Sequence, residues 1–312
     1  MKMHDCYEPK VLILLATYNG MLWLEEQLES ITKQTGVRVK ILISDDHSDD
    51  GSLDSILEFI ESNSNAEMIT SEKSSGSAGQ NFFRLIRNCD YQNFDYIAFS
   101  DQDDVWLADK LVSGIECLKS SSVCGYSSAT LAVWESGKER LIKQAKQIRN
   151  FDFLFEGAGQ GCTFILKHDF FGYVQEFCVD NKEVTNRFYY HDWLVYILAR
   201  ASHKEWFFDE RSFIRYRQHS TNDTGAKGSL EAVRNRLKLI KNGWFKAQIS
   251  IALEISKLVV KQSVDLDDFG QVFYRNDSLT RRLILMKFLV VNGRRKTSER
   301  MVLATASLLG WI

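Results

Sequence analysis

Two aspartates two residues apart, Asp101 and Asp103, follow an apolar stretch and are separated by Gln102. Carboxylates at this spacing can both turn toward one hard cation if the chain bends between them. Mg²⁺ and Mn²⁺ prefer such oxygen ligands together with phosphate oxygens. The alternative is a solvated acidic turn that caps a helix over residues 105–120, with Asp104 as the N-cap. The position directly after an expected strand favours the metal interpretation.

A second acidic pair, Asp45 and Asp46, also follows an apolar stretch. A carboxylate there can accept a hydrogen bond from a ribose hydroxyl or from the N3–H of a pyrimidine. Equally, it can lie at a helix N-terminus, where the helix dipole favours acids. The chain has neither a G-x-x-x-x-G-K-[ST] nor a G-x-G-x-x-G sequence that would hold phosphates through glycine amides. A bound nucleotide diphosphate would therefore need a metal, which agrees with Asp101 and Asp103.

Two further clusters, in the second half of the sequence, have residue types that could take part in a reaction. Asp192, within His-Asp-Trp at residues 191–193, opens an expected helix and is either a cap or a general base. Residues 215–219, Arg-Tyr-Arg-Gln-His, read as a strand whose alternation places Arg215, Arg217 and His219 on one face. That face is either solvated or able to hold a leaving diphosphate.

The elements that must position these clusters alternate between strand and helix over the first hundred residues. We expect strands at 10–16, 37–44, 66–70 and 94–100, and helices at 21–34, at 53–60 and around 82–86. This order predicts a mostly parallel, doubly wound α/β sheet, Rossmann-like in character. Ligands bind such sheets at the carboxyl ends of the strands. The polar clusters at 17–20, 45–52 and 101–104 should therefore converge on one edge.

The second half is organised differently. We expect strands at 124–134, 161–167, 205–208 and 213–217, and helices at 190–201, 229–241, 244–260, 278–291 and 298–309. Residues 1–224 carry 23 Lys and Arg against 34 Asp and Glu, whereas residues 225–312 carry 16 against 7. The charges thus predict an acidic body over 1–224 and a basic helical region over 225–312, with different partners. Nucleic acid or anionic lipid could each meet such a basic region.

Composition narrows the class of protein. The chain has 312 residues, 45% of them hydrophobic and 26% charged, with a single proline. These values describe a globular protein and exclude collagen-like or broadly disordered chains. Six scattered cysteines without a C-x-x-C sequence support neither a zinc site nor a disulfide framework. No apolar run approaches the roughly 20 residues of a membrane helix, and the N-terminus lacks a signal-peptide pattern, so we expect a cytoplasmic protein.

Taken together, the clusters resemble those of family-2, GT-A-type glycosyltransferases, and within them the bacterial rhamnosyltransferases that build cell-surface polysaccharides. The resemblance covers roughly residues 10–222. The stretches that carry it are Ala-Thr-Tyr-Asn-Gly at 16–20, Ser-Asp-Asp-His-Ser-Asp-Asp-Gly at 44–51, Ser-Asp-Gln-Asp-Asp-Val-Trp at 100–106, His-Asp-Trp at 191–193 and Tyr-Arg-Gln-His at 216–219. The Asp-Gln-Asp-Asp-Val-Trp sequence is more specific than D-x-D alone.

The resemblance implies a role for each cluster. Asp192 would be the base that deprotonates the acceptor hydroxyl, giving inversion at the anomeric carbon. Mg²⁺ or Mn²⁺ on the diphosphate would be held by Asp101, Asp103 and His219. The nucleotide-sugar would be bound by Thr17, Tyr18, Asn19, Asp45, Asp46, Asp101, Gln102, Arg215 and Arg217. The acid pair often found before the base appears here as His-Asp, so this role rests on Asp192 alone.

The resemblance also implies the partners. The donor would be dTDP-L-rhamnose, or a UDP-sugar on the same scaffold, and the acceptor a growing lipid-linked glycan, with no nucleic-acid partner. The basic helices would hold the enzyme at the inner face of the plasma membrane, or would pack on protein, including a second copy in a homodimer. Two other classes remain open from the residues alone: a phosphoacceptor receiver domain and a non-catalytic nucleotide-sugar-binding module.

Overall fold

A computed structural model describes residues 7–219, 230–260 and 263–312. The chain forms two compact units. The first comprises Met1–Lys143, Gly159–Lys182 and Glu205–Asp223, and the second comprises Gln144–Ala158, Glu183–Lys204 and Thr224–Ile312. The expected boundary at residue 224 and the expected helix start at Ser229 lie outside the described residues.

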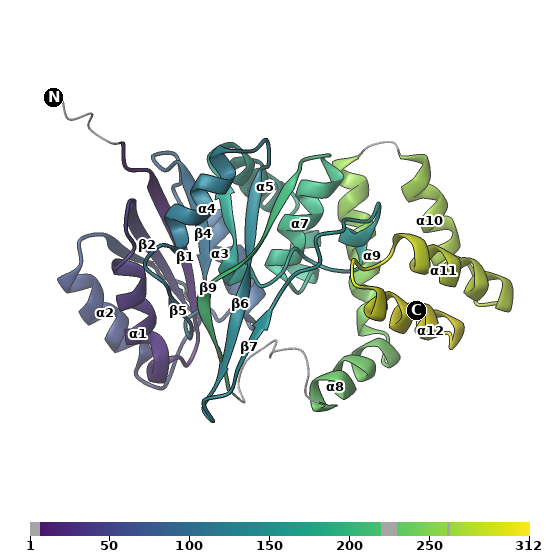
Figure 1. The fold of residues 1–312 in the computed structure, drawn as a ribbon, viewed down its shortest axis with the longest axis horizontal. Helices are drawn as coiled ribbons and strands as arrows, with labels where there is room; N and C mark the ends of the chain where they lie inside the picture. The colour runs from purple at the N-terminus through teal and green to yellow at the C-terminus, as the bar shows by residue number, and fades with distance from the viewer. Residues whose placement is uncertain (1–6, 220–229, 261–262) are drawn as a thin grey trace. The chain divides into compact units, whose positions relative to one another are not determined.

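The first unit contains a nine-stranded sheet in the order β3-β2-β1-β4-β8-β6-β9-β5, with β7 paired to β6 (Figure 1). Its first part is parallel and is formed by β1 (Lys10–Thr17), β2 (Arg38–Asp45), β3 (Ala66–Ile69) and β4 (Tyr96–Ser100). The intervening helices are α1 (Met21–Thr32), α2 (Ser52–Ser62) and α3 (Ala78–Asn88). The alternation read from the sequence is confirmed here, with shifts of one or two residues at most ends.

The strand β1 is central and has an apolar side chain on both faces. Val11, Ile13 and Leu15 belong to one buried cluster with α1, α2 and α4 (Lys110–Lys119). Helix α3 packs on the opposite face, beside α5 (His168–Asp180) (Figure 1). A strand covered by helices on both faces reads as a continuous apolar run, which is why residues 10–16 were recognisable. The covered sheet holds its carboxyl edge rigidly in place.

The second part of the sheet departs from the parallel pattern. The strand β8 (Ile165–Lys167) runs antiparallel to β4 and to β6 (Gly125–Trp134), and β7 (Glu139–Ile142) runs antiparallel to β6. Residues 161–163 form a 3₁₀ turn rather than the start of that strand. The two short strands expected at 205–217 are one, β9 (Trp206–Gln218), whose pairing with β6 is irregular at Ser128–Leu131. The sheet is therefore mixed: it is parallel from β3 to β4, antiparallel where β8, β7 and β5 pair, and parallel again between β6 and β9.

The prediction of one helix over residues 105–120 is wrong at its start. Val105 and Trp106 form β5, which pairs antiparallel with Ile214 and Arg215 of β9, and α4 begins only at Lys110. Asp104 consequently caps no helix: the N-cap of α4 is Asp109. The non-local pairing with β9 overrides the local helical pattern.

The second unit is helical. Its helices include α7 (His191–Ala201), α8 (Leu230–Lys241), α9 (Trp244–Val259), α10 (Val264–Tyr274), α11 (Leu279–Asn292) and α12 (Thr297–Leu308), and α6 (Lys182–Arg187) joins the two units along the chain (Figure 1). The sequence did not indicate α10. The rings of Phe269 and Phe288 stack on each other within the second unit, with their centroids 4.6 Å apart. Within the described residues, no helix combines the length and apolarity needed to cross a bilayer.

Two arginines of the basic helical region, for which we expected contact with a membrane or a protein surface, are internal. Arg281 is 1% exposed and donates hydrogen bonds to the carbonyl oxygens of Phe273 and Ile312. Arg295 is likewise buried, with its guanidinium 3.3 Å from Asp152. Arg281 holds α11 to the end of α10 and to the C-terminal residue, and Arg295 holds the start of α12 to Asp152, so neither side chain is available to a lipid surface.

Candidate functional site

The three polar loops at the carboxyl ends of β1, β2 and β4 contact one another. Gln102 clamps the main chain of Tyr18, since its Oε1 accepts from Tyr18 N at 2.7 Å and its Nε2 donates to Tyr18 O at 2.8 Å. Asn19 N donates to Ser48 Oγ at 2.9 Å, which ties the first loop to the second. The expected convergence of these loops is confirmed. The side-chain amide of Gln102 thus binds the main chain of the protein, and Tyr18 is 57% exposed.

Gly20 is required by this clamp. A Cβ at this position would lie 2.5 Å from the Gln102 amide, so any larger residue displaces it. The backbone of Gly20 has φ −108°, which other residues adopt readily. The requirement is therefore for space and not for a special backbone conformation.

Thr17 and Asp45 lie beneath the loop surface. Thr17 is 1% exposed and its hydroxyl donates to Asp45 Oδ1 at 2.9 Å. Asp45 also accepts from the amide and hydroxyl of Ser48, at 2.9 and 2.6 Å. Thr17 and Asp45, both predicted to bind the nucleotide, thus stabilise the loop after β2 through these hydrogen bonds.

Asp46 is buried, and its carboxylate is anchored by the loop before α3. It accepts from Ser75 N at 2.5 Å and from Ser74 Oγ at 2.9 Å, and pairs with Arg84 Nη2 at 2.9 Å. Burial raises the pKa of Asp46, but the hydrogen bonds from Ser75, Ser74 and Gly76 outweigh it and hold the pKa below its usual value. Asp46 is therefore an oriented carboxylate anion.

Arg84 was not singled out from the sequence. It lies on α3, and its guanidinium also donates to the carbonyl oxygen of Lys73 at 2.8 Å. One signal was available: Arg84 is a basic residue among the apolar positions 82, 83, 85 and 86 of an amphipathic helix. The guanidinium of Arg84 therefore balances the charge of the Asp46 carboxylate.

Asp103 and His219 meet at the end of β4 and β9. His219 Nε2 lies 2.7 Å from Asp103 Oδ2, and the imidazole stacks on the indole of Trp23 with centroids 3.9 Å apart. Arg217 Nε donates to the carbonyl oxygen of Asp103 at 3.0 Å. Residues from two separate motifs, 100–106 and 215–219, are thereby brought together. Trp23, which the sequence did not indicate, fixes the plane of the imidazole ring.

The two strand arginines do not share a function in this structure. Arg217 pairs with Glu26 of α1 at 2.5 Å, close to the acidic loop. Arg215 lies exposed and pairs with Glu139 of β7 at 2.9 Å. The expected alternation is correct, because Tyr216 and Gln218 are buried. Only Arg217, however, contacts the residues around Asp103.

The residues at the acidic loop fit a hard divalent cation. Oxygen ligands from Asp101 and Asp103 with an imidazole nitrogen from His219 suit Mg²⁺ or Mn²⁺ that keeps water and phosphate oxygens. Asp101, Asp104 and Cys162 also bring one ligand atom each within 4.8 Å of one another. Burial raises the pKa of Cys162 well above its usual value, which keeps a neutral thiol there. Among the described residues, Asp101, Asp104 and Cys162 are the group whose ligand atoms lie this close together, and a metal held by Asp101, Asp103 and His219 stays a prediction.

Asp192 belongs to the second unit. It lies half-buried in the first turn of α7, and its Oδ1 accepts from Trp193 N at 2.7 Å. The N-cap of α7 is Tyr190, so Asp192 is not the capping residue. Trp193 fixes the turn from the other side, since its Nε1 donates to Phe153 O at 2.7 Å. A general base must lie within hydrogen-bond reach of the proton that it accepts, and this role for Asp192 stays a prediction.

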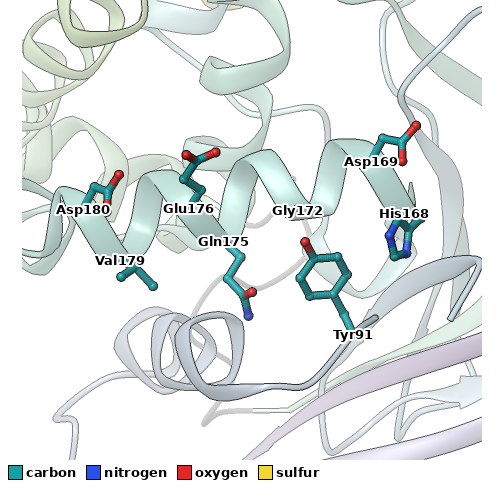
Figure 2. Close-up of a pocket in the computed structure, with 8 residues that line it drawn as sticks. All are labelled: Tyr91, His168, Asp169, Gly172, Gln175, Glu176, Val179 and Asp180. Atoms are coloured by element: carbon teal, nitrogen blue, oxygen red, sulfur yellow. The ribbon is translucent and has the colours of Figure 1, made fainter. Parts of the chain in front are cut away.

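A shallow pocket of about 530 Å³ runs along α5, and its lining includes none of the predicted site residues. Figure 2 shows the acidic side chains of Asp169, Glu176 and Asp180 along one side of the helix. Gly172 gives room to the hydroxyl of Tyr91, which would lie 2.5 Å from a Cβ. The pocket offers no group suited to hold a diphosphate.

Comparison with known proteins agrees with this geometry. The model of glycosyl transferase family 2 matches residues 12–172. The dTDP-rhamnosyl transferase RfbG of Shigella flexneri is 40% identical over 237 residues, which cover 76% of this chain and 82% of that protein. A second relative, the UDP-Glc:alpha-D-GlcNAc-diphosphoundecaprenol beta-1,3-glucosyltransferase WfgD of Escherichia coli, is 32% identical over 36% of this chain and 42% of its own length.

Solved structures share the fold at low sequence identity. TarS 1-349 of S. aureus in complex with UDP-GlcNAc has a TM-score of 0.53 and 16% identity, over 97% of this chain and 89% of that one. The mannosyltransferase PcManGT of Pyrobaculum calidifontis, in complex with GDP-Man and Mn²⁺, has a TM-score of 0.51 and 13% identity, over 97% and 88%. With the family match over more than half of its length, the chain belongs to glycosyl transferase family 2, and its first unit has the GT-A fold.

Proposed function

We propose that the protein transfers L-rhamnose from dTDP-L-rhamnose, with inversion, to a hydroxyl of a growing cell-surface polysaccharide. The observation that carries the donor assignment is the 40% identity to a dTDP-rhamnosyl transferase over 237 residues. A UDP-sugar on the same scaffold is the alternative donor. Residues 1–224 would form the catalytic domain and residues 225–312 an accessory helical region.

In this proposal the converging loops bind the nucleotide. Asp46, an anchored anion, accepts from the N3–H of the thymine or from a ribose hydroxyl, while the exposed ring of Tyr18 covers the base. Thr17, Asn19, Asp45 and Gln102 keep the loops in register through the contacts described above. Their contribution to donor affinity is to pre-organise the loops.

Asp101, Asp103 and His219 would hold Mg²⁺ or Mn²⁺ against the diphosphate. The metal supplies positive charge where the leaving diphosphate gains negative charge. Arg217, fixed by Glu26 and by Asp103 O, adds a second positive group at the same edge. Arg215 is committed to Glu139 and would contribute through the long-range field only. Asp192 would accept the proton of the acceptor hydroxyl as that oxygen attacks the anomeric carbon.

The test is a donor titration by calorimetry with Mn²⁺ present, using dTDP-L-rhamnose, UDP-glucose, UDP-galactose and UDP-N-acetylglucosamine. We expect the dTDP-sugar to bind most tightly and to be slowly hydrolysed, with both signals lost in EDTA. Preference for a UDP-sugar would refute the rhamnosyl assignment and leave the metal-dependent mechanism standing. Binding without hydrolysis or transfer would instead identify a non-catalytic nucleotide-sugar-binding module.

We also propose that the helical region holds the enzyme at the inner face of the plasma membrane, near a lipid-linked acceptor. The support is a set of exposed apolar side chains on α11 and α12, among them Leu279 at 71% and Val291 at 61% exposure, with the exposed Lys287 between them. Basic and apolar side chains together suit an anionic lipid interface.

Flotation with anionic liposomes at low salt tests the membrane proposal. The full chain should float, and the Leu279→Glu/Val291→Glu variant should remain in the soluble fraction with unchanged donor hydrolysis. If the wild-type chain stays at the bottom of the gradient but sediments as a dimer, the exposed side chains form a protein interface and the membrane proposal is wrong.

A further inference from the structure

A buried carboxylate joins three segments of the second unit. Asp152 lies in the 3₁₀ turn Asp152–Leu154 and is completely buried. Its Oδ2 accepts a hydrogen bond from Tyr196 Oη of α7 at 2.9 Å and another from Arg295 Nη1 at 3.3 Å. Arg200 Nη1, also of α7, lies 3.6 Å from its Oδ1. The carboxylate therefore ties both α7 and the residues before α12 to this turn.

Arg295 and its neighbour Arg294 also bind the main chain that follows the turn. Arg295 Nη2 donates to the carbonyl oxygen of Gly157 at 2.7 Å, and Arg294 Nε donates to that of Phe155 at 3.0 Å. Gly157 lies directly against α7, because a Cβ there would be 3.2 Å from the Cα of Trp193. This stretch of main chain is therefore held between the two arginines and the first turn of α7.

Trp193 connects this stretch to Asp192. Its indole Nε1 donates to the carbonyl oxygen of Phe153 at 2.7 Å, and its main-chain N donates to Asp192 Oδ1 at 2.7 Å. Trp193 is itself buried. A displacement of the turn that follows Asp152 would therefore move the first turn of α7, and Asp192 with it.

The charges of this network balance. The guanidinium groups of Arg200 and Arg295 face the carboxylates of Asp152 and Glu156, with Arg295 Nε 3.6 Å from Glu156 Oε1. Arg295 is only 4% exposed. Removing such charges from water costs free energy that offsets their attraction, so apolar side chains can often replace a buried ion pair without loss of stability. What a hydrogen-bonded network of buried charges provides is a rigid arrangement of the segments that carry it.

We infer that Arg295 is a positioning residue for Asp192. Through Asp152 and the carbonyl oxygen of Gly157 it holds the first turn of α7 in place, and it thereby fixes the direction of the Asp192 carboxylate. The inference rests on the proposed role of Asp192 as the general base. It assigns to Arg295 no contact with the donor, the acceptor or the metal, and it gives the helical region a part in the reaction besides membrane contact.

The test measures the hydrolysis of dTDP-L-rhamnose in the presence of Mn²⁺, in which water takes the place of the acceptor. The water oxygen forms a bond to the anomeric carbon, its proton passes to Asp192, and dTDP leaves with the electron pair of the broken bond. Arg295→Met removes the charge and keeps the length of the side chain. We expect kcat to fall about tenfold or more, because a misplacement of about 1 Å can cost about 10²-fold in rate. Donor affinity, measured by calorimetry, should not change.

Arg281→Met is the matched control for general loosening of the helical unit. Arg281 is equally buried, and it also donates to two main-chain carbonyl oxygens, those of Phe273 and Ile312. This variant should lower Tm, yet its kcat per folded molecule should equal that of wild type. An equal loss of kcat in Arg281→Met and Arg295→Met would overturn the inference.

A double-mutant cycle with Asp192→Asn shows whether Arg295 acts through Asp192. In the Asp192→Asn background, Arg295→Met should lower kcat no further. The same fold-loss in both backgrounds would overturn the inference, as would wild-type kcat in Arg295→Met. Tyr196→Phe, which removes a single hydrogen bond to Asp152, goes through the same cycle and should show a smaller loss that also disappears in the Asp192→Asn background. It decides the question if Arg295→Met does not fold.

The proposed function fails separately. If Asp192→Asn hydrolyses the donor at the wild-type rate, the base assignment is wrong and the role of Arg295 falls with it. If Asp192→Asn is impaired and Arg295→Met is not, only the role of Arg295 is refuted. If wild type hydrolyses UDP-glucose instead of dTDP-L-rhamnose, the donor assignment is wrong and the cycle is measured with UDP-glucose. Hydrolysis of neither donor would refute both the proposed function and the inference.

Discussion

Replacing Gly20 by alanine should disrupt the clamp between Gln102 and Tyr18 without straining the backbone. The new Cβ would lie 2.5 Å from the Gln102 amide, so the amide must move and both of its hydrogen bonds to Tyr18 are lost. At about 0.5–1.5 kcal/mol per hydrogen bond, the free energy of unfolding should fall by about 2 kcal/mol. For a unit of this size that corresponds to a decrease in Tm of about 4–8 °C.

A double-mutant cycle isolates this cause. In the Gln102→Ala background the clash and the clamp are both absent, so Gly20→Ala should then cost close to nothing, or stabilise slightly by restricting the unfolded chain. Thermal unfolding of the four proteins, followed by near-ultraviolet circular dichroism, gives the coupling energy. Donor affinity should follow the same pattern, because the clamp shapes the nucleotide-binding loop. An equal loss of stability in both backgrounds would show that our reasoning about Gly20 is wrong.

Three further predictions concern the acids. Asp103→Asn should abolish sugar transfer at any Mn²⁺ concentration, and a transfer assay that shows wild-type rates in EDTA would contradict it. Asp192→Asn should lower kcat by about 10²–10⁴-fold with donor affinity unchanged; near-normal turnover would leave Asp192 a structural residue of α7. The pKa of Asp46 is held below the ordinary value of about 3.9. The stability it contributes is therefore complete above that pH and lost as the pH falls through the folded-state pKa. Asp46→Asn should flatten the acid limb of the unfolding free energy against pH, and an unchanged limb would refute this.

The sequence predicted the parallel half of the sheet well because its signals are local. Residues 10–16 form an apolar run, and polar clusters with helix-capping residues follow β1, β2 and β4. That these clusters converge follows from topology alone, since parallel strands end at one edge. Asp103 and His219 are 116 residues apart, and the resemblance to the family implied that they lie together. The structure confirms this contact.

What the sequence could not predict depends on contacts between distant segments. Val105 and Trp106 read as the start of a helix, yet they extend the sheet because β9 offers a free edge. Arg281 and Arg295 read as surface charges, since a buried guanidinium is recognisable only when its carbonyl and carboxylate partners are known. Asp104 is indistinguishable from its neighbours in sequence, although it is completely buried next to a partly exposed Asp101.

The three loops at the sheet edge are fastened to one another by side-chain to main-chain bonds, and this has a consequence for engineering donor choice. Gln102 of one loop is fitted to Gly20 of another, and Asn19 is fitted to Ser48 of the third. In a chimera that takes only one loop from a relative with a different donor, a residue of the new loop would face a partner residue to which it is not fitted. Specificity should therefore be transplantable only when all three loops are exchanged as a set.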